Sequence, residues 1–272
     1  GDLEGTEPSG LDDHFFFVHA DERPEHRHGG RGADHGHVVE RLGGHLAHHV
    51  PRHQRLGAHL ARHTLQNGMK LVMLPKTSRG GIVSATIQLR FGDEKSLTGL
   101  RATGDLAGAL LMRGTKTRTR QQLQDEMLKL NARIDANGGA GRATATINTT
   151  GANLVPALRL AVEMLREPAF PDTEFDQVKK QRVAGIENNR TDPAALAPLA
   201  LNRAMNPFPR GDVRYVGTID EQIEDVNKVS LNDVRKFQAR FYGASHGELV
   251  IIGSQAVLGQ FPYRWFELRR LR

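Results

Sequence analysis

The 272-residue sequence contains no cysteine and no run of about 18 apolar residues that could cross a bilayer. The absence of cysteine excludes disulfides and thiolate metal sites, but it leaves the compartment undecided. Aromatic residues are scarce, with three tyrosines and one tryptophan, and the net charge of +6 is not gathered into a basic run. A nucleic-acid-binding surface needs a basic stripe with stacking aromatics, or a known motif. We therefore expect no nucleic-acid partner, and we expect no membrane partner either.

Lysine is missing from the first part of the chain, and histidine is nearly missing from the rest. Twelve of the thirteen histidines lie before residue 64, and no lysine precedes residue 70. The apolar residues of this stretch show no sustained period. We predict that residues 1–63 are disordered or are an out-of-frame translation of GC-rich DNA, and we regard residues 255–272 as an equally atypical tail. A metal site built from clustered histidines, such as His45, His48 and His49, is the alternative.

Organised sequence runs through residues 64–254, which we predict to form one lobe. Asn67-Gly68 is a strong hairpin signal, and residues 70–74 after it are predicted to form a strand. Residues 81–91 alternate between polar and apolar side chains, which predicts a second strand. The lobe therefore opens with β-structure.

The central stretch, residues 99–130, is predicted to form two helices around a Gly-Thr turn. The first helix is apolar on most of its circumference, and we expect it to stop at Gly114, because glycine adopts a left-handed φ at little cost. The second should begin after Thr119, since Gln122 follows at the spacing of a capping box. Its apolar residues are expected to share one buried face: Leu123, Met127, Leu128 and Leu130.

The remainder of the lobe is predicted to contain two strands, several helices and a last strand. The two strands, residues 133–136 and 142–149, should flank a turn at Asn137-Gly138-Gly139. Capping residues or proline mark several helix starts: Asn153, Asp172, Asp192-Pro193 and Ser230. The final strand, residues 248–253, is short and apolar, which is typical of a central strand. This order predicts an α+β fold, in which helices pack on an antiparallel or mixed β-sheet.

At this point residues 64–254 resemble a lobe of the insulinase/pitrilysin-like zinc metallopeptidases, the inverzincins. The resemblance rests on the helix that runs into Gly114-Thr115, on the Leu-x-Asn-Gly hairpin, and on NPFPRGDVRYVGTIDEQIEDV and SLNDVRKFQARFYGASHGELVIIG. In the family, His-x-x-Glu-His precedes this turn and supplies two zinc ligands and the base that activates water. Counting back from the turn, these positions hold Asp105, Gly108 and Ala109. The resemblance therefore implies the family's second, non-catalytic half, with the lobe fold of the mitochondrial processing peptidases.

We predict no catalytic and no metal-binding residue in this chain, and the sequence identifies no substrate-binding residue. The family's third zinc ligand is a glutamate on a later helix, and Glu187 lies in that region. Without the two histidines, however, we expect Glu187 to be a solvated helix carboxylate. Asp105 could act as an acid, but Gly108 and Ala109 leave it without a partner.

Three other features are assigned structural roles. His246 is expected to be a surface loop residue, and Ser245 beside it lacks the strand–turn–helix setting of a nucleophile. The glycine-rich residues 138–141 should form a turn, because a phosphate loop must open a helix. The family's second half supplies an arginine and a tyrosine to the substrate from a section beyond the last strand. Arg214 and Tyr215 lie before that section and are not assigned this role.

By resemblance, the intact protein would cleave peptides inside a closed chamber, and zinc would come from the other half or from a partner subunit. This lobe alone would be inactive and would hold no cofactor. It would line the chamber, hold extended peptide along a sheet edge and pack against the zinc-bearing half. Relatives of this type are often exported, which favours the periplasm. Two alternatives stay open: a lobe that only scaffolds a complex, and a truncated gene fragment.

Overall fold

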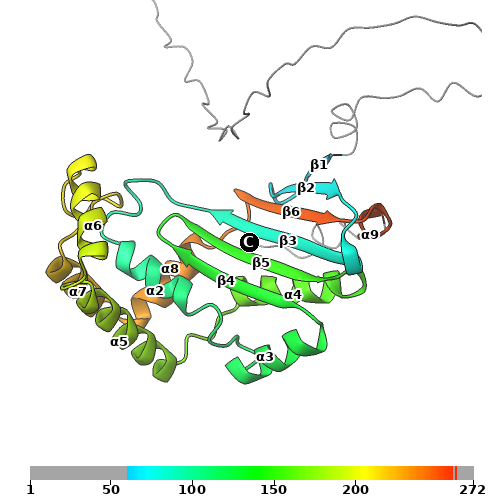
Figure 1. Ribbon diagram of the computed structural model, residues 1–272. Coiled ribbons are helices and arrows are strands. Elements are labelled where there is room, and N and C mark those ends of the chain that lie inside the picture. The colour runs from blue at the N-terminus through cyan, green and yellow to red at the C-terminus, as the bar shows by residue number, and fades with distance from the viewer. Residues whose placement is uncertain (1–59, 260, 262–272) are drawn as a thin grey trace, which may run out of the picture. The chain divides into compact units, whose positions relative to one another are not determined.

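The computed structural model describes residues 60–259 and Phe261, which form one mixed sheet with helices packed on it (Figure 1). The strands are β1 (Ala61–Thr64), β2 (Lys70–Pro75), β3 (Ile82–Arg90), β4 (Arg133–Gly139), β5 (Arg142–Thr150) and β6 (Gly247–Gly253). The helices are η1 (Arg79–Gly81), α2 (Arg101–Ala109), α3 (Arg120–Lys129), η2 (Gly151–Asn153), α4 (Leu154–Arg166), α5 (Asp172–Asn188), α6 (Pro193–Met205), α7 (Ile219–Lys228), α8 (Leu231–Phe241) and α9 (Gln255–Gly259). The predicted α+β class is confirmed.

The sheet has the strand order β1-β2-β6-β3-β5-β4. β2 and β6 run parallel, and the other neighbouring strands run antiparallel. The last strand therefore lies between β2 and β3, as its apolar sequence predicted. β4, in contrast, lies at an edge of the sheet, with β5 as its one strand partner among the described residues.

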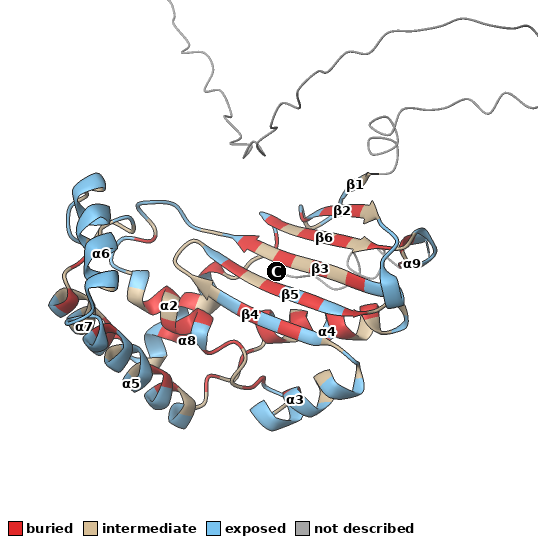
Figure 2. Ribbon diagram, in the orientation of Figure 1, coloured by how far each residue is buried: buried red, intermediate tan, exposed pale blue. Residues whose placement is uncertain are grey.

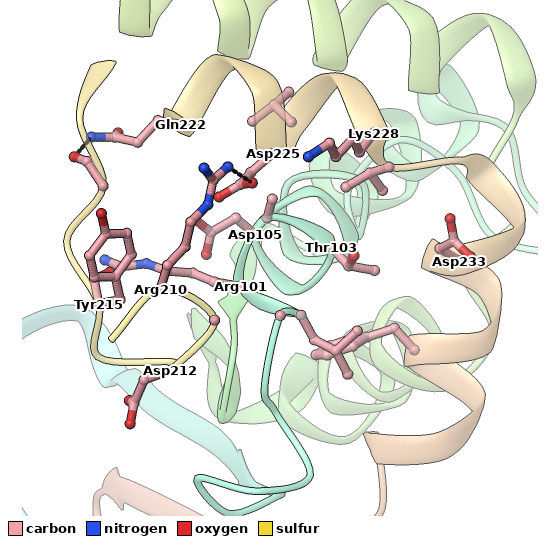
Figure 3. Close-up of a pocket in the computed structure, with 18 of the residues that line it drawn as sticks. Arg101, Thr103, Asp105, Arg210, Asp212, Tyr215, Gln222, Asp225, Lys228 and Asp233 are labelled. Atoms are coloured by element: carbon pink, nitrogen blue, oxygen red, sulfur yellow. Dashed lines mark hydrogen bonds and ion pairs between the residues drawn. The ribbon is translucent and has the colours of Figure 1, made fainter. Parts of the chain in front are cut away.

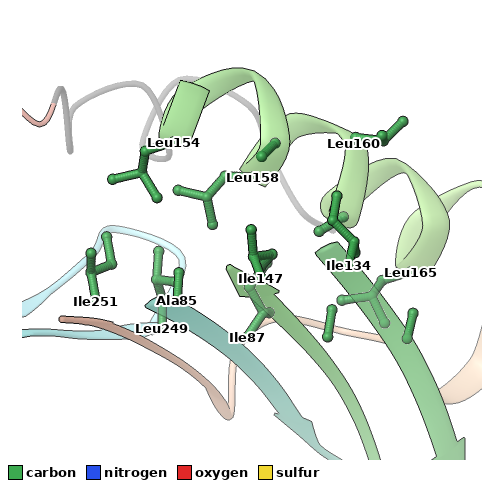
Figure 4. Close-up of a cluster of buried hydrophobic side chains, with 14 of the residues drawn as sticks. Ala85, Ile87, Ile134, Ile147, Leu154, Leu158, Leu160, Leu165, Leu249 and Ile251 are labelled. Atoms are coloured by element: carbon green, nitrogen blue, oxygen red, sulfur yellow. The ribbon is translucent and has the colours of Figure 1, made fainter. Parts of the chain in front are cut away.

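One face of the sheet carries the larger hydrophobic core. Alternate residues of β3 and β5 are buried, whereas Thr146 and Asn148 between them are exposed (Figure 2). The helix α4 covers this buried face, and its leucines meet the isoleucines of the sheet (Figure 4). The side chains involved are Leu154, Leu158 and Leu165 of α4, with Ile87, Ile134, Ile147 and Ile251 of the strands. Strand alternation thus produces a single buried face, as the period of two requires.

A second core holds the helices α2, α5, α7 and α8 together. It contains Leu106, Leu110, Phe175, Val226 and Phe237, all of which are buried. The aromatic rings of Phe91, Phe237 and Phe241 stack within it, with ring centroids 4.8 to 5.9 Å apart. α2 contributes to this helical core and also lies against β4, so it connects the two cores.

Both predicted borders of the lobe differ from the observed ones. β1 begins at Ala61, three residues before the expected start, because residues 61–64 pair with β2 to complete the hairpin. At the other end, α9 starts at Gln255, and Leu258 and Phe261 are buried in the sheet core. The first residues of the predicted tail are therefore part of the packed structure. The histidines 45, 48 and 49 lie outside the described residues.

Several local predictions in the central stretch are wrong. α2 ends at Ala109 rather than at Gly114, because the chain turns there and buries Leu110 and Leu111 in the two different cores. Gly114, with φ +130°, lies in the next turn. Leu128 is 78% exposed, since it points about 100° away from Met127 on α3 and faces solvent.

Of three capping assignments, two are confirmed and one is wrong. Thr119 and Gln122 form the predicted capping box, as do Ser230 and Asp233 at the start of α8. Asn153 precedes α4 but makes no side-chain cap, because its amide donates to the carbonyl oxygen of Leu130 at 2.9 Å. Local capping boxes were therefore predictable, whereas this long-range bond was not.

The turn after α2 is held by the half-buried carboxylate of Glu163 on α4. The hydroxyls of Thr115 and Thr117 donate to it at 2.5 and 2.6 Å, and the guanidinium of Arg118 donates to its second oxygen. Burial raises the pKa of Glu163, but the three donors outweigh burial, so the pKa lies below its model-compound value of 4.5. The ionised carboxylate therefore stabilises the fold.

We predict that Glu163→Gln lowers the free energy of unfolding by about 1 to 2 kcal/mol near neutral pH, because the charge-assisted bonds are lost. A lowered folded pKa gives stability that is present above the unfolded pKa and lost as pH falls through the folded pKa. The difference between the two proteins should therefore shrink below pH 4.5. Urea denaturation at several pH values measures it. Glu167→Gln, a neighbouring change at an exposed ion pair, should have little effect, and an equal loss in both variants would contradict the assignment.

Candidate functional site

The helix α2 occupies the place where the family would carry its zinc motif, and it lies unusually close to β4. Gly104 and Gly108 are one turn apart and face the strand together. A Cβ atom built on Gly104 would lie 2.7 Å from the backbone nitrogen of Ala140. A Cβ on Gly108 would lie 2.3 Å from the carbonyl oxygen of Gly138. Both positions are therefore restricted to glycine.

This contact also explains why Gly138 and Gly139 belong to β4, although the sequence predicted a turn there. The strand continues to Gly139, and the chain reverses at Ala140 and Gly141, where Gly141 has φ +99°. Strand residues without side chains let the backbone of α2 approach. The glycine-rich segment is therefore a packing surface for a helix.

The residues at the three motif positions do not fit zinc. Gly108 lies at the position that the sequence comparison assigned to the glutamate, and its surroundings leave no space for any side chain. Asp105 forms an ion pair with Arg182 at 3.3 Å, and Ala109 is exposed and has no ligand atom. Within residues 60–259, no group of three or more His, Cys, Asp or Glu side chains is placed to hold a metal. No catalytic step through zinc can be derived for this lobe.

The other residues weighed from the sequence have structural partners. Glu187 lies on the exposed side of α5 and accepts from Arg190 at 2.8 and 3.1 Å, which lowers the pKa of the Glu187 carboxyl. His246 lies in an exposed loop, where its Nδ1 is 3.2 Å from the hydroxyl of Ser245. Neither group lines any of the hollows described below.

Arg214 and Tyr215 also hold local structure. Arg214 pairs with Asp212 and Glu94 at 2.8 and 2.5 Å, and it lies over the ring of Phe208 at 3.8 Å. Tyr215 donates its hydroxyl to Glu221 at 2.8 Å. Both side chains are therefore engaged in contacts within the lobe.

A hollow of about 680 Å³ lies beside α2 and is enclosed by α5, α6, α7, α8 and the loop before α7 (Figure 3). Arg101 and Asp105 line it, and the same two residues also line a smaller hollow of about 340 Å³ beside β4. Asp105 therefore separates two cavities. The larger volume is within the range of ligand sites in proteins.

Asp105 lies against both hollows and is only partly exposed. Burial raises the pKa of Asp105, and the positive charges of Arg182 and Arg101 oppose this rise. Nearby, the hydroxyl of Tyr242 lies against Gly138 and finds no hydrogen-bond partner in the described part of the chain. Burial and the Asp105 charge both raise the pKa of Tyr242, so this hydroxyl stays protonated.

Much of the polar rim of the larger hollow is internally paired. Arg101 donates to the carbonyl oxygen of Tyr215 at 2.7 Å, and Arg210 donates to Asp225 at 3.3 Å (Figure 3). No sequence pattern indicates this site, because its lining comes from five helices and a loop that only the fold brings together. Periodicity reports which face of each helix is apolar, but not which faces leave a hollow between them.

Within residues 60–259, no helix combines the length and apolarity that crossing a bilayer requires.

Comparisons with known proteins agree with this geometry. No family model matches the chain. The zinc protease PqqE of Helicobacter pylori is 22% identical over 193 residues, which are 70% of this chain and 42% of that protein. A Pseudomonas fluorescens structure described as a peptidase M16 inactive domain is 19% identical, with a TM-score of 0.63, over 76% of this chain and 48% of that one. The periplasmic protease PqqL of Escherichia coli is 14% identical, with a TM-score of 0.64, over 79% of this chain and 24% of that one.

The chain thus spans about half the length, or less, of the relatives it matches. It has the fold of the insulinase/pitrilysin-like, or M16, peptidases. The predicted resemblance to that family is confirmed at the level of the fold, and one of the matched structures is that of an inactive domain.

The contact between α2 and β4 gives a direct test by mutation. We predict that Gly108→Ala lowers the free energy of unfolding by about 3 kcal/mol, because the new methyl group meets the fixed backbone of β4. The control is Gly185→Ala in α5, where a Cβ would meet nothing within 4 Å. Alanine is the better helix former, so this change should stabilise the protein by up to about 1 kcal/mol. Urea denaturation measures both, and a stable Gly108→Ala variant would refute the close approach.

Proposed function

We propose that this M16-type lobe is the non-catalytic, substrate-binding and chamber-forming half of a zinc peptidase that acts on peptides. Zinc would be supplied by another half, either in the same chain or in a partner subunit. The observation that carries the proposal is the contact of Gly108 with the backbone of Gly138, because it removes both the catalytic carboxylate and the space for one. A lobe with this fold but without this chemistry retains surfaces for binding.

The edge strand β4 supports a role in holding peptide. It pairs with β5 on one side, and no described strand pairs with its other side. The hollow of about 340 Å³ lies along this strand and is lined by Asn137, Gly138 and Gly139 together with Arg142. An extended peptide can add to such an edge by main-chain hydrogen bonds, and a neighbouring hollow can take a side chain.

Two further points are part of the proposal. We propose that the lobe comprises residues 64–254 together with the short elements β1 and α9 at its borders, and that the rest of residues 1–63 and 255–272 does not belong to it. We also propose a periplasmic location. The similarity to PqqL, which is a periplasmic protease by name, supports it.

The zinc part of the proposal predicts the outcome of a difference experiment. Zinc bound to the full chain should be identical in stoichiometry for the natural protein and for the Asp105→Ala/Glu187→Ala double variant, because neither carboxylate holds zinc. Equilibrium dialysis with metal analysis measures this. Both proteins contain residues 1–63, so any zinc that the histidines there bind is the same in both and does not affect the difference in stoichiometry. Loss of one zinc in the double variant would contradict the proposal, as would cleavage of a test peptide by the chain and zinc alone.

A further inference from the structure

The helix α6 is almost entirely apolar and yet is not buried. Of its thirteen residues, only Asn202 and Arg203 are neither alanine, leucine, methionine nor proline, and none is buried. Leu196, Leu201 and Met205 are 37%, 59% and 69% exposed, and they are three of the five large exposed hydrophobic residues in the described chain (Figure 2). A helix that is apolar on all sides is normally covered.

Two hollows lie along α6. The 680 Å³ hollow is lined by Leu199 and Asn202 of this helix, and a second hollow of about 420 Å³ is lined by Ala200, Arg203 and Ala204. Tyr215 and Val216 line both hollows and so separate them. We call the two hollows and the face of α6 between them the α6 groove.

The α6 groove has an apolar floor. Ile186, Val226 and Phe237 line the larger hollow, and each is less than 9% exposed. Pro207 and Phe208 line the smaller one. An apolar side chain that entered either hollow would exchange water for apolar contacts, which is favourable.

The lining of the α6 groove carries an excess of positive charge. Six cations and four carboxylates line the larger hollow, and Arg203 lines the smaller one. Four of these cations form no ion pair within 4 Å among the described residues: Arg101, Lys236, Arg240 and Arg203. The charges of Arg101 and Lys236 act at longer range on Asp105 and Asp233, and Arg240 lies over the ring of Phe241 at 4.8 Å. The net charge that the groove presents to a ligand is therefore positive.

We propose that the α6 groove binds an extended peptide segment in which large apolar side chains alternate with acidic ones. The inference rests on the proposed function and names the class of peptide that the lobe would hold. The apolar side chains would enter the two hollows, and the acidic ones would meet the unpaired cations.

A second copy of the chain fits this surface less well than a peptide does. A helix of thirteen residues is about 20 Å long, and such a ridge buries much less than the roughly 800 Å² per partner of a stable interface. The groove also consists of two separate hollows, which match side chains better than they match a second ridge. Area and charge together favour a peptide.

The test uses fluorescence anisotropy with the full chain and three labelled peptides of equal length. One alternates leucine with aspartate, one leucine with lysine, and one serine with aspartate. We expect the leucine–aspartate peptide to bind about tenfold more tightly than the other two. It alone has apolar side chains for the floor of the groove and acidic side chains for the cations of its rim. Added salt should weaken the binding of this peptide, because salt screens the charges of the exposed rim.

Two variants locate the binding site. Lys236→Glu should weaken binding of the leucine–aspartate peptide about fivefold, and Leu199→Asn should weaken it about tenfold. The matched control is Lys180→Glu, which reverses an exposed lysine of α5 outside both hollows and should leave binding unchanged. Circular dichroism and thermal unfolding confirm that each variant is folded.

The outcomes separate the inference from the proposed function. If the peptides bind equally well and Lys236→Glu has no effect, the α6 groove is not the site, although the lobe still holds peptide. If no peptide binds, the peptide-holding function fails together with the groove. If the chain dimerises in sedimentation and Leu201→Glu dissociates the dimer without affecting peptide binding, a second copy covers α6 and the inference is overturned.

Discussion

The close approach of α2 to β4 is the constraint on which this lobe depends. Two glycines one helical turn apart, Gly104 and Gly108, let the helix backbone rest on the backbone of Gly138 and Ala140. From that position, the chain at the end of α2 places Leu111 in the sheet core, while Leu106 and Leu110 enter the core shared with α5, α7 and α8. A helix held further from the strand would separate the two cores, and the hollow beside α2 would lose its shape. One backbone contact therefore fixes both the packing and the candidate site.

The same contact determines what chemistry the lobe can perform. A catalytic glutamate needs a side chain directed at the reacting atoms, and position 108 has no space for even a methyl group. Asp105, one turn earlier on the same helix, forms an ion pair with Arg182. Close packing of the helix on the strand therefore excludes a side chain at position 108, whatever residue type a related protein carries there.

The sequence predicted what short-range rules govern. Capping boxes need residues three apart, and strand alternation needs only a period of two, so Thr119, Ser230 and the buried face of β5 were predictable. Prediction from the sequence failed where contacts between segments far apart in the chain determine the local structure. Gly138 extends a strand because α2 lies on it, and Leu128 faces solvent because α3 packs through Leu123. The hollow beside α2 was not predictable either, because no rule of spacing relates residues of five helices. The family resemblance predicted that α2 would lie at the candidate site. It did not predict how closely α2 packs against β4.

A lobe that holds no zinc can still contribute to a peptidase by binding peptide, as we propose for this one. In a peptidase, binding energy from parts of the substrate far from the cleaved bond positions that bond, and it requires no metal where it is generated. Such binding needs apolar surface that is accessible in the free protein, and this requirement conflicts with stability, which favours covering it. α6 shows the conflict directly, since a helix of alanine and leucine is left exposed while every other long helix buries an apolar face. Asp192 caps the first turn of α6, Pro193 fixes the first helical φ, and alanine favours the helix, but Pro198 inside the helix lacks the N–H of a helical hydrogen bond. The start of α6 is therefore well defined by its own sequence, whereas its interior is not. A ligand that covered the helix would offset both the exposed apolar surface and the cost of this proline.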